Sequence, residues 1–290
     1  MRIDALEKLA EHYLVESASK RAVPLPKLNV LRRERVSLLE AVVYNPVLCL
    51  ILRGSKVTGI GSQSVTLRRG DALLVSHDLP VTSRIIEASP QSPYLALILS
   101  LDLGIVRSLY EQVGDAITDA PDARSLTAHA AGAEWTEPLE RYLAMMDRPL
   151  EAQVLGPAIL REIHFRLLLS PIGGMLRNLL SVDSHASRIA KAIARIRHGF
   201  REPLSVPDLA RLAGMSQSSF HEHFKAVTGT TPIQYLKDLR LIEAHSLLRD
   251  GQRSVSATSF EVGYESPTHF SRDYSRKFGC PPRLHLAQMS

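Results

Sequence analysis

The last third of the chain carries one sequence pattern twice. The first copy starts at Ser205 and reads SVPDLARLAGMSQSSFHEHFK, and the second starts at Val255 and reads VSATSFEVGYESPTHFSRDYSRKFG. Each copy predicts a short helix, a turn at a glycine and a second helix with aromatic and basic residues. A single helical hairpin of this kind is common in bundles, but two in series predict an all-helical domain that presents two similar helices.

Local signals in the first copy fix where its helices begin. Ser205 opens a capping box, and Gly214 supplies the turn. Ser216 is the predicted N-cap of the second helix, in which Phe220 and Phe224 repeat at i, i+4 and point inward. The outward-facing residues of that helix are the contact candidates Gln217, Ser218, His221, Glu222 and Lys225.

The second copy repeats this arrangement with different residues. Phe260 is expected to help pack its first helix, and Gly263 turns the chain. Ser266–Pro267 combines an N-cap with a proline at the first helical position, while Phe270 and Tyr274 are expected to be buried. The contact candidates on the exposed face of this helix are Thr268, Ser271, Arg272 and Arg276.

A further helix is predicted between the two copies. It opens at Thr231–Pro232 and continues to about Asp250. Its apolar stripe consists of Ile233, Leu236, Leu239, Ile242 and Leu247. Such a helix spans roughly 30 Å, near the ~34 Å between successive major-groove faces on one side of DNA. The spacing therefore predicts a DNA reader whose two exposed helices enter neighbouring grooves.

These residues resemble the AraC/XylS family of bacterial transcription regulators. The resemblance covers roughly Ser187 to Ala287 and includes both units, the linking helix and the closing FGCPP at Phe278–Pro282. It implies a seven-helix DNA-binding domain that contacts promoter DNA and helps or hinders RNA polymerase.

The chain departs from the family pattern in each unit. Glu222 stands where the family often has arginine, and it can either accept a hydrogen bond from a cytosine amine or weaken attraction to phosphates. Thr258 and Ser259 stand where an aliphatic residue and an alanine are usual. This polar pair is expected to loosen the packing of the second unit.

The positive charge of the chain lies in its C-terminal third. The whole sequence has 35 Lys and Arg residues against 30 Asp and Glu, and from Ser184 onward there are 15 basic and 9 acidic residues. The rest therefore holds 20 basic and 21 acidic residues. Excess positive charge favours binding to phosphates and makes that binding sensitive to salt, although a basic surface can also have no partner.

The overall composition is that of a two-domain intracellular protein. With 290 residues and 45% hydrophobic residues, the chain is long enough for two cores. Two cysteines, Cys49 and Cys280, suit a reducing compartment. Neither an export signal nor an apolar run of about 20 residues is evident, so a cytoplasmic location without membrane contact is expected.

The first half has a sequence pattern typical of β-strands. Together with the helical C-terminal part, this predicts an α+β fold class. From about Arg35 to Asp102, short runs rich in Val, Ile and Leu alternate with turn residues, as in an antiparallel barrel or sandwich. Helical periods follow at Leu103 to Val113, Trp135 to Met146 and Leu150 to Leu169. The predicted division is residues 1–181 for the β domain, 182–187 for a linker and 188–290 for the double helix-turn-helix domain.

The β segments also resemble the N-terminal domain of AraC-type regulators. The matching stretches are YNPVLCLILRG, GDALLVS, DLPV and EASPQSPYLAL, within roughly Leu25 to Leu180. The resemblance implies a cupin-like β-barrel that senses a signal, with helices that mediate dimerisation. The residues Leu155, Ile159, Ile163 and Leu167 form a candidate homodimer seam, or they pack against their own barrel.

The sequence gives no sign of enzyme chemistry. A metal-dependent cupin needs several histidines and carboxylates at one cavity, and across the strands we find only His77 with Asp71, Asp78 and Glu87 nearby. A phosphate-binding glycine loop, a zinc-protease motif and a nucleophile elbow are also absent. We therefore expect neither a catalytic residue, a metal nor a cofactor.

Cys49 is the candidate for reactive chemistry. Strand alternation places it on the same face as Val47 and Ile51. If that face lines the barrel, Cys49 could sense electrophiles such as aldehydes, with Arg53 stabilising its thiolate. Tyr44 and His77 are the other pocket candidates. The alternative is that Cys49 is an unreactive residue that only packs in the core.

Two classes of function follow from the sequence. The leading one is a sequence-specific transcription regulator, an activator, controlled by a small molecule or an electrophile in the N-terminal domain. The alternative is a metal-free small-molecule-binding cupin or an enzyme whose helical domain serves protein contacts.

Overall fold

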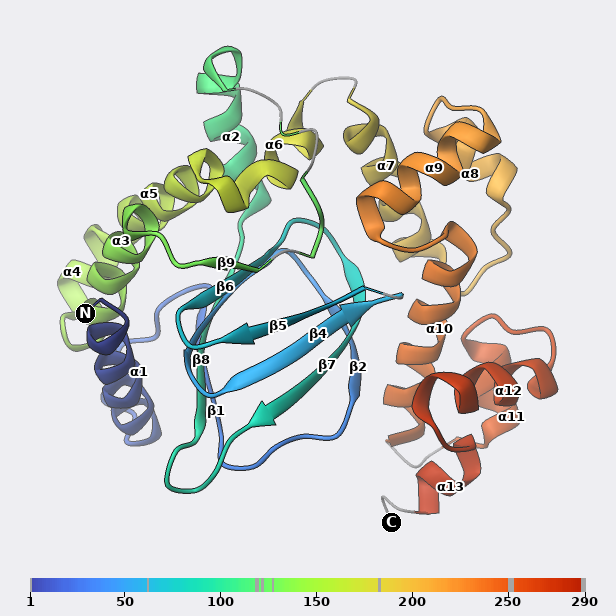
Figure 1. The fold of residues 1–290 in the computed structure, drawn as a ribbon, viewed down its shortest axis with the longest axis horizontal. Coiled ribbons are helices and arrows are strands. Elements are labelled where there is room, and N and C mark those ends of the chain that lie inside the picture. Colours follow the sequence, from blue (N-terminus) through green and yellow to red (C-terminus); the bar gives the residue numbers. More distant parts are fainter. Residues whose placement is uncertain are drawn as a thin grey trace.

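The N-terminal part of the protein is built on two antiparallel β-sheets that face each other (Figure 1). The computed structural model describes residues 2–61, 63–117, 120, 123–126, 128–181, 184–249 and 253–287. The strands are β1 (Leu28–Arg33), β2 (Glu40–Tyr44), β3 (Val47–Arg53), β4 (Ser55–Ile60), β5 (Gln63–Arg68), β6 (Asp71–Val75), β7 (Leu79–Glu87), β8 (Tyr94–Ser100) and β9 (Ala128–Ala130). One sheet has the order β1-β8-β3-β6-β9 and the other β2-β7-β4-β5.

Strand β3 shows how alternation divides the side chains between two cores. Leu48, Leu50 and Leu52 face the helices that cover the five-stranded sheet, whereas Cys49 and Ile51 face the space between the sheets. The predicted face of Cys49 is confirmed. Because successive side chains of a strand point to opposite faces, a strand buried on both sides reads as one continuous apolar run.

Helices cover the outer face of the five-stranded sheet. They are α1 (Arg2–Ala18), α2 (Leu103–Val113), α3 (Ala133–Leu143), α4 (Pro149–Val154), α5 (Gly156–Leu169) and α6 (Gly174–Leu180). Trp135, Tyr142 and Leu139 of α3 are buried in the core that these helices share with the sheet. The prediction of an α+β fold with accessory helices is confirmed.

Of the two alternatives for Leu155, Ile159, Ile163 and Leu167, packing within their own domain holds for three of the four residues. Ile159, Ile163 and Leu167 are buried in the helix–sheet core of their own chain, and only Leu155 is 48% exposed. Helix α5 packs against α3 and α2, so its apolar face is already covered. The apolar periodicity identified a core-facing stripe, which is the commoner reason for such a pattern.

The C-terminal part is entirely helical, as predicted. Its helices are α7 (His185–Gly199), α8 (Val206–Leu212), α9 (Gln217–Thr228), α10 (Pro232–Arg249), α11 (Val255–Glu261), α12 (Pro267–Phe278) and α13 (Pro282–Ala287). Two separate apolar cores lie inside it, one around α7 to α9 and one around α11 and α12. Helix α10 contributes Tyr235 and Leu239 to the first core, and Leu241, Ala244 and Leu248 to the second.

The predicted linker overlaps the start of α7. Ser184 caps this helix by accepting a hydrogen bond from the backbone N–H of Ser187 at 3.0 Å. The helix itself begins at His185, within the expected linker of residues 182–187. Residues 182 and 183 lie outside the described residues.

The two parts of the chain contact each other through the four-stranded sheet. The Tyr235 hydroxyl of α10 donates to the carbonyl oxygen of Asp78 at 2.6 Å, and the Arg197 guanidinium lies 3.2 Å from the Asp78 carboxylate. Burial raises the pKa of Asp78, and attraction to Arg197 offsets part of this. The turn at Gly61 also abuts Gly229, at the end of α9. The helical domain therefore rests on β2, β4 and β7, on the side of the sheets away from α1 (Figure 1).

Candidate nucleic-acid interface and sensor cavity

The caps and turn of the first helix-turn-helix unit form as predicted. Ser205 accepts a hydrogen bond from the Asp208 N–H at 3.2 Å at the start of α8. Gly214 has φ +63°, a left-handed conformation that glycine adopts without steric cost. Ser216 caps α9 by accepting from the Ser219 N–H at 3.3 Å. These contacts set the angle at which α9 leaves the turn.

Helix α9 separates a buried face from an exposed one. Phe220 and Phe224 are fully buried, with ring centroids 5.5 Å apart. The five contact candidates Gln217, Ser218, His221, Glu222 and Lys225 are all exposed. The first contact face therefore has the position that DNA contact requires, and the role of each side chain stays a prediction.

The second unit presents α12 in the same way. Gly263 has φ +92°, and Ser266 accepts from the His269 N–H at 3.4 Å to cap the helix. Phe270 and Tyr274 are buried. Of the four contact candidates, Thr268, Arg272 and Arg276 are exposed and Ser271 is half-buried.

Ionic contacts to two buried aspartates hold α12 against α10. The Asp273 carboxylate, 2% exposed, lies 2.9 Å from both the Lys237 ammonium and the Arg276 guanidinium. Lys277 contacts the buried Asp238 at 2.7 Å. Burial works to raise the pKa of Asp273, but hydrogen bonding and attraction from Lys237, with further attraction from Arg276, hold it below its ordinary value. Arg276 is therefore both a contact candidate and a partner in this network.

Helix α11 buries polar residues where an apolar residue was expected. Thr258 and Ser259 are fully buried, whereas Phe260 is 55% exposed. Ser259 donates to the Ser256 carbonyl at 2.8 Å, but the Thr258 hydroxyl has no hydrogen-bond partner among the described residues. The expectation that Phe260 packs the first helix of this unit is thus wrong.

A cavity of about 500 Å³ opens between the two sheets, and we call it the sensor cavity. Its walls come mostly from β2, β3, β7 and β8 and from the segment before β2. The side chains lining it include the sequence candidates Tyr44 and Cys49. Arg53 and His77 are not part of the lining.

Three polar groups meet in the buried part of the sensor cavity. The Lys56 ammonium donates to the Tyr44 hydroxyl at 3.2 Å and lies 5.3 Å from the centre of the Tyr44 ring. Tyr94 is fully buried, and burial raises the pKa of its phenol, with Cys49 and Tyr44 adding to the effect. The sequence analysis missed Lys56 and Tyr94, although strand alternation along β4 places Lys56 on the face of Ile60.

Arg53 lies on the other side of the sheet from Cys49. The register between β3 and β8 shifts between Ile51 and Arg53, a β-bulge that turns the Arg53 side chain toward α1. Its guanidinium forms ion pairs with Glu7 and with Glu11. The expectation that Arg53 stabilises a Cys49 thiolate does not fit this geometry.

His77 is a buried neutral side chain outside the sensor cavity. Burial lowers its pKa to about 4, so the ring carries no charge at neutral pH. Its Nδ1 lies 3.1 Å from the Ser76 hydroxyl, and its Nε2 has no hydrogen-bond partner in the described part of the chain. It follows β6 next to Asp78, so its place is at the contact between the two domains.

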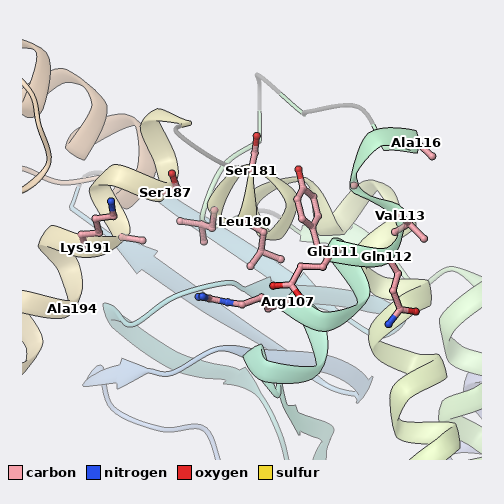
Figure 2. Close-up of a pocket in the computed structure, with 14 residues that line it drawn as sticks. Arg107, Glu111, Gln112, Val113, Ala116, Leu180, Ser181, Ser187, Lys191 and Ala194 are labelled. Carbon is pink, nitrogen blue, oxygen red and sulfur yellow. The ribbon is translucent and has the colours of Figure 1, made fainter.

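A second cavity, of about 770 Å³, lies where the N-terminal helices meet α7. Its lining combines α2, the end of α6 and the exposed face of α7. Arg107 extends from α2 toward α7, where Lys191 lies, and Leu180 and Ser181 come from the end of α6 and the residue after it (Figure 2). The cavity therefore spans the connection between the sensor helices and the first helix of the DNA-binding candidate domain.

The described residues contain neither a membrane-spanning helix nor a metal-binding cluster. No helix among them is both long and apolar enough to span a membrane. Within the same residues, no cluster of three or more His, Cys, Asp or Glu side chains is arranged to hold a metal ion.

Curated proteins match about half of the chain. RhaS of Escherichia fergusonii, an HTH-type transcriptional activator, is 32% identical over 146 residues, which is 50% of this chain and 52% of RhaS. RhaS of an Escherichia coli strain is 31% identical over 147 residues, with 52% of its length covered. The chain thus spans about half the length of the curated relatives it matches.

Solved structures share the fold over almost the whole chain. An apo variant of ToxT from Vibrio cholerae covers 91% of this chain and 97% of its own, with a TM-score of 0.55 and 14% identity. ToxT with a bound unsaturated fatty acid covers 90% of this chain, with a TM-score of 0.53 and 12% identity. At this identity the likeness concerns the arrangement of the two domains alone.

Family profiles match both parts of the chain. The profile described as "AraC-type transcriptional regulator N-terminus" matches residues 24–175, more than half of the chain, and the profile described as "Helix-turn-helix domain" matches residues 209–288. The first match includes the two sheets with the sensor cavity, and the second includes both contact helices. The chain belongs to the AraC-type transcriptional regulators.

Proposed function

We propose that this protein binds promoter DNA through α9 and α12 and activates transcription under the control of its N-terminal domain. The observation that carries the proposal is the pair of exposed helix faces, each built on its own core and both joined to α10. Helix-turn-helix proteins place such a second helix in the major groove, where side chains reach base edges. The activator role rests on the relatedness to RhaS.

The sensor cavity is the proposed site of the controlling signal. ToxT has been solved with an unsaturated fatty acid and with a naphthalenyl-butenoic acid, which are both small organic molecules. A cavity of about 500 Å³ lies within the roughly 300–1,000 Å³ typical of small-molecule sites. Cys49 lines the same cavity, so an aldehyde or another electrophile is a second kind of signal that this site could receive.

Further parts of the proposal concern partners, location and domain division. RNA polymerase is the proposed partner of the DNA-bound activator, in the cytoplasm and without enzyme activity of its own. A homodimer would use the exposed Leu150 and Val154 of α4 with Leu155, because the rest of the expected seam is buried. The proposed division is residues 1–181 for the sensor domain and His185 onward, where α7 begins, for the DNA-binding domain.

Footprinting of the purified protein over the DNA around its own gene tests the function. We expect protection of two major-groove segments about one helical turn apart, lost as salt concentration rises. Lys225→Ala and Arg272→Ala should each weaken protection, because each removes an exposed positive charge from one contact helix. Lys8→Ala, which removes an exposed charge from α1, is the matched control and should leave the footprint unchanged.

Two results would reject the proposal. One is the absence of protection at every salt concentration, on this DNA and on genome-derived fragments selected for binding. The other is an equal loss of affinity in Lys8→Ala, Lys225→Ala and Arg272→Ala, which would mean that net charge alone, rather than the two helices, is responsible.

A further inference from the structure

We propose that the sensor cavity binds a small, largely apolar carboxylate whose anionic group is held by Lys56 and Tyr94. This inference rests on the proposed function, since it names the chemical class of the controlling molecule. Its basis is the buried polar groups of the cavity and the apolar side chains that line it with them.

The first argument is the buried ammonium group of Lys56. The residue is 5% exposed, and its ammonium donates a hydrogen bond to a neutral acceptor, the Tyr44 hydroxyl, at 3.2 Å. None of the ion pairs between described residues involves Lys56, and the nearby Glu87 accepts from Ser55 at 3.0 Å. A buried charge is costly unless it is paired. Cys49 and Tyr44 already stabilise the Lys56 ammonium, and a ligand carboxylate would add a fully anionic partner.

The second argument is the orphaned hydroxyl of Tyr94. Tyr94 lines the same cavity and is fully buried, and its hydroxyl makes no hydrogen bond within the described part of the structure. Buried polar side-chain atoms nearly always have a partner, so an orphan facing a cavity indicates a missing ligand or water. A phenol donates well to a carboxylate, and Lys56 and Tyr94 together offer two donors to its two oxygens.

The third argument is the distribution of charge along the cavity. The lining contains the apolar side chains Leu31, Val42, Val47, Ile85 and Ile98, together with the uncharged polar residues Ser37, Asn45, Ser83 and Ser100. The other charged side chains of the lining, Arg33 and Glu40, are exposed and so lie at its rim. Lys56 is thus the buried cation of the lining, which matches a molecule with one anionic group and a largely apolar body rather than a polyanion.

The protonation state of Lys56 separates anion binding from condensation with an aldehyde. Burial lowers the pKa of Lys56, but Cys49 and Tyr44 raise it by more, so it lies above its ordinary value. Lys56 is then an ammonium at neutral pH. An ammonium group attracts a carboxylate, whereas a Schiff base requires the free amine.

Calorimetric titration of the full chain tests the inference with pairs of ligands of equal size and different charge. The probes are butanoate, hexanoate, octanoate and benzoate, each compared with its primary amide. We expect at least one carboxylate to bind and its amide to bind about tenfold more weakly or not at all.

Three variants locate the binding group. Lys56→Met should weaken binding of that carboxylate about tenfold or more, and Tyr94→Phe by a few fold. Tyr94→Phe removes only a hydroxyl without a described partner, so it should fold even if Lys56→Met does not. Arg33→Met removes a cation at the rim and should keep the wild-type affinity.

Several outcomes would overturn the inference. One is an amide that binds as well as its acid, and another is an affinity for the carboxylate that is unchanged in both Lys56→Met and Tyr94→Phe. A third is a loss of carboxylate affinity in Arg33→Met alone. The fourth is that no carboxylate binds to protein that still shows an intact thermal transition. Covalent mass addition from an aldehyde, abolished in Cys49→Ser and accompanied by no carboxylate binding, would assign the cavity to electrophiles instead.

The same samples distinguish this inference from the proposed function. Salt-sensitive binding to duplex DNA is measured by fluorescence anisotropy for wild type and Lys56→Met. If the carboxylate binds but DNA does not, the proposed function fails and the ligand assignment stands. If both proteins bind DNA and no carboxylate binds, the ligand assignment alone fails.

Discussion

The two helix-turn-helix units display their contact helices alike but are held together by different forces. In the first unit the interior is aromatic and aliphatic, with Phe220, Phe224 and Tyr235 packed together. In the second unit the interior also contains Asp273, which is paired with cations of α10 and α12. An exposed contact helix can thus be held in place by an apolar interior, as in the first unit, or by one that also contains ion pairs, as in the second. The ionic one makes the second contact helix depend on pH and salt.

The largest predicted effect breaks the apolar support of the first unit. Phe224→Ala removes a fully buried ring that contacts both Phe220 and Tyr235, and should lower the free energy of unfolding by about 3–5 kcal/mol. Phe260→Ala is the matched control, because its ring is largely exposed, and it should change stability by less than about 0.5 kcal/mol. Urea unfolding of both variants measures the difference. Equal effects would contradict the assignment of the two rings.

The next effect removes the ionic support of the second unit. Asp273→Asn keeps the size of the side chain but loses charge-assisted contacts to Lys237 and Arg276, at a cost of about 2 kcal/mol at pH 7. Asp208→Asn, which changes an exposed acid in the first unit, is the control. An unchanged stability of Asp273→Asn would mean that the apolar contacts of α12 suffice.

The same aspartate predicts how the second unit responds to acid. Because the pKa of Asp273 is lowered in the folded protein, its contribution is present above the unfolded pKa of about 3.9 and is lost as pH falls through the folded value. Stability measured between pH 6 and pH 3 should therefore fall less steeply in Asp273→Asn than in wild type. Parallel curves would assign the acid sensitivity to other groups.

A smaller effect of opposite sign is expected at Thr258. Thr258→Val replaces a buried hydroxyl that has no described partner with a methyl group of similar size, and should stabilise the protein by about 1 kcal/mol. Ser259→Ala, which loses a hydrogen bond to Ser256, should instead destabilise by about 1 kcal/mol. Thermal unfolding of the two variants and wild type measures both changes in stability. Destabilisation by Thr258→Val would indicate that its hydroxyl has a partner in solution.

The smallest effect concerns the acid on the first contact helix. Glu222→Gln removes a negative charge from a face proposed to meet phosphates, and should raise the affinity for unrelated DNA about twofold. Glu34→Gln removes an exposed carboxylate from the sensor domain and should have no effect. If affinity falls for one promoter sequence only, Glu222 reads a base there.

Features that depend on neighbouring residues could be predicted from the sequence. The caps at Ser205, Ser216 and Ser266 form because each serine hydroxyl reaches a backbone N–H only three residues away. Helix α2 has the predicted bounds, Leu103–Val113, and Cys49 lies on the face that strand alternation gives. In each case the deciding contact is local or follows from a regular period.

Features that depend on distant packing could not be predicted. The bulge that redirects Arg53 arises in the pairing of β3 with β8, and the pattern of β3 alone gives no sign of it. Ile233 was placed in the apolar stripe of α10 but is exposed, because the buried face runs through Tyr235 instead. Lys56 and Tyr94 share a cavity only because the two sheets face each other.

Helix α10 supplies core residues to both units, and under the proposed function this fixes the spacing of the operators that the protein can use. Helix α10 has 18 residues and is therefore roughly 27 Å long, and both contact helices pack against it. In the proposed function, an effector can rotate this assembly as a whole, but it cannot widen the gap between the two contact helices without breaking α10. Inserting a single base pair moves the two half-sites about 3.4 Å apart and rotates one about the DNA axis. A promoter altered in this way should stay silent at any effector concentration.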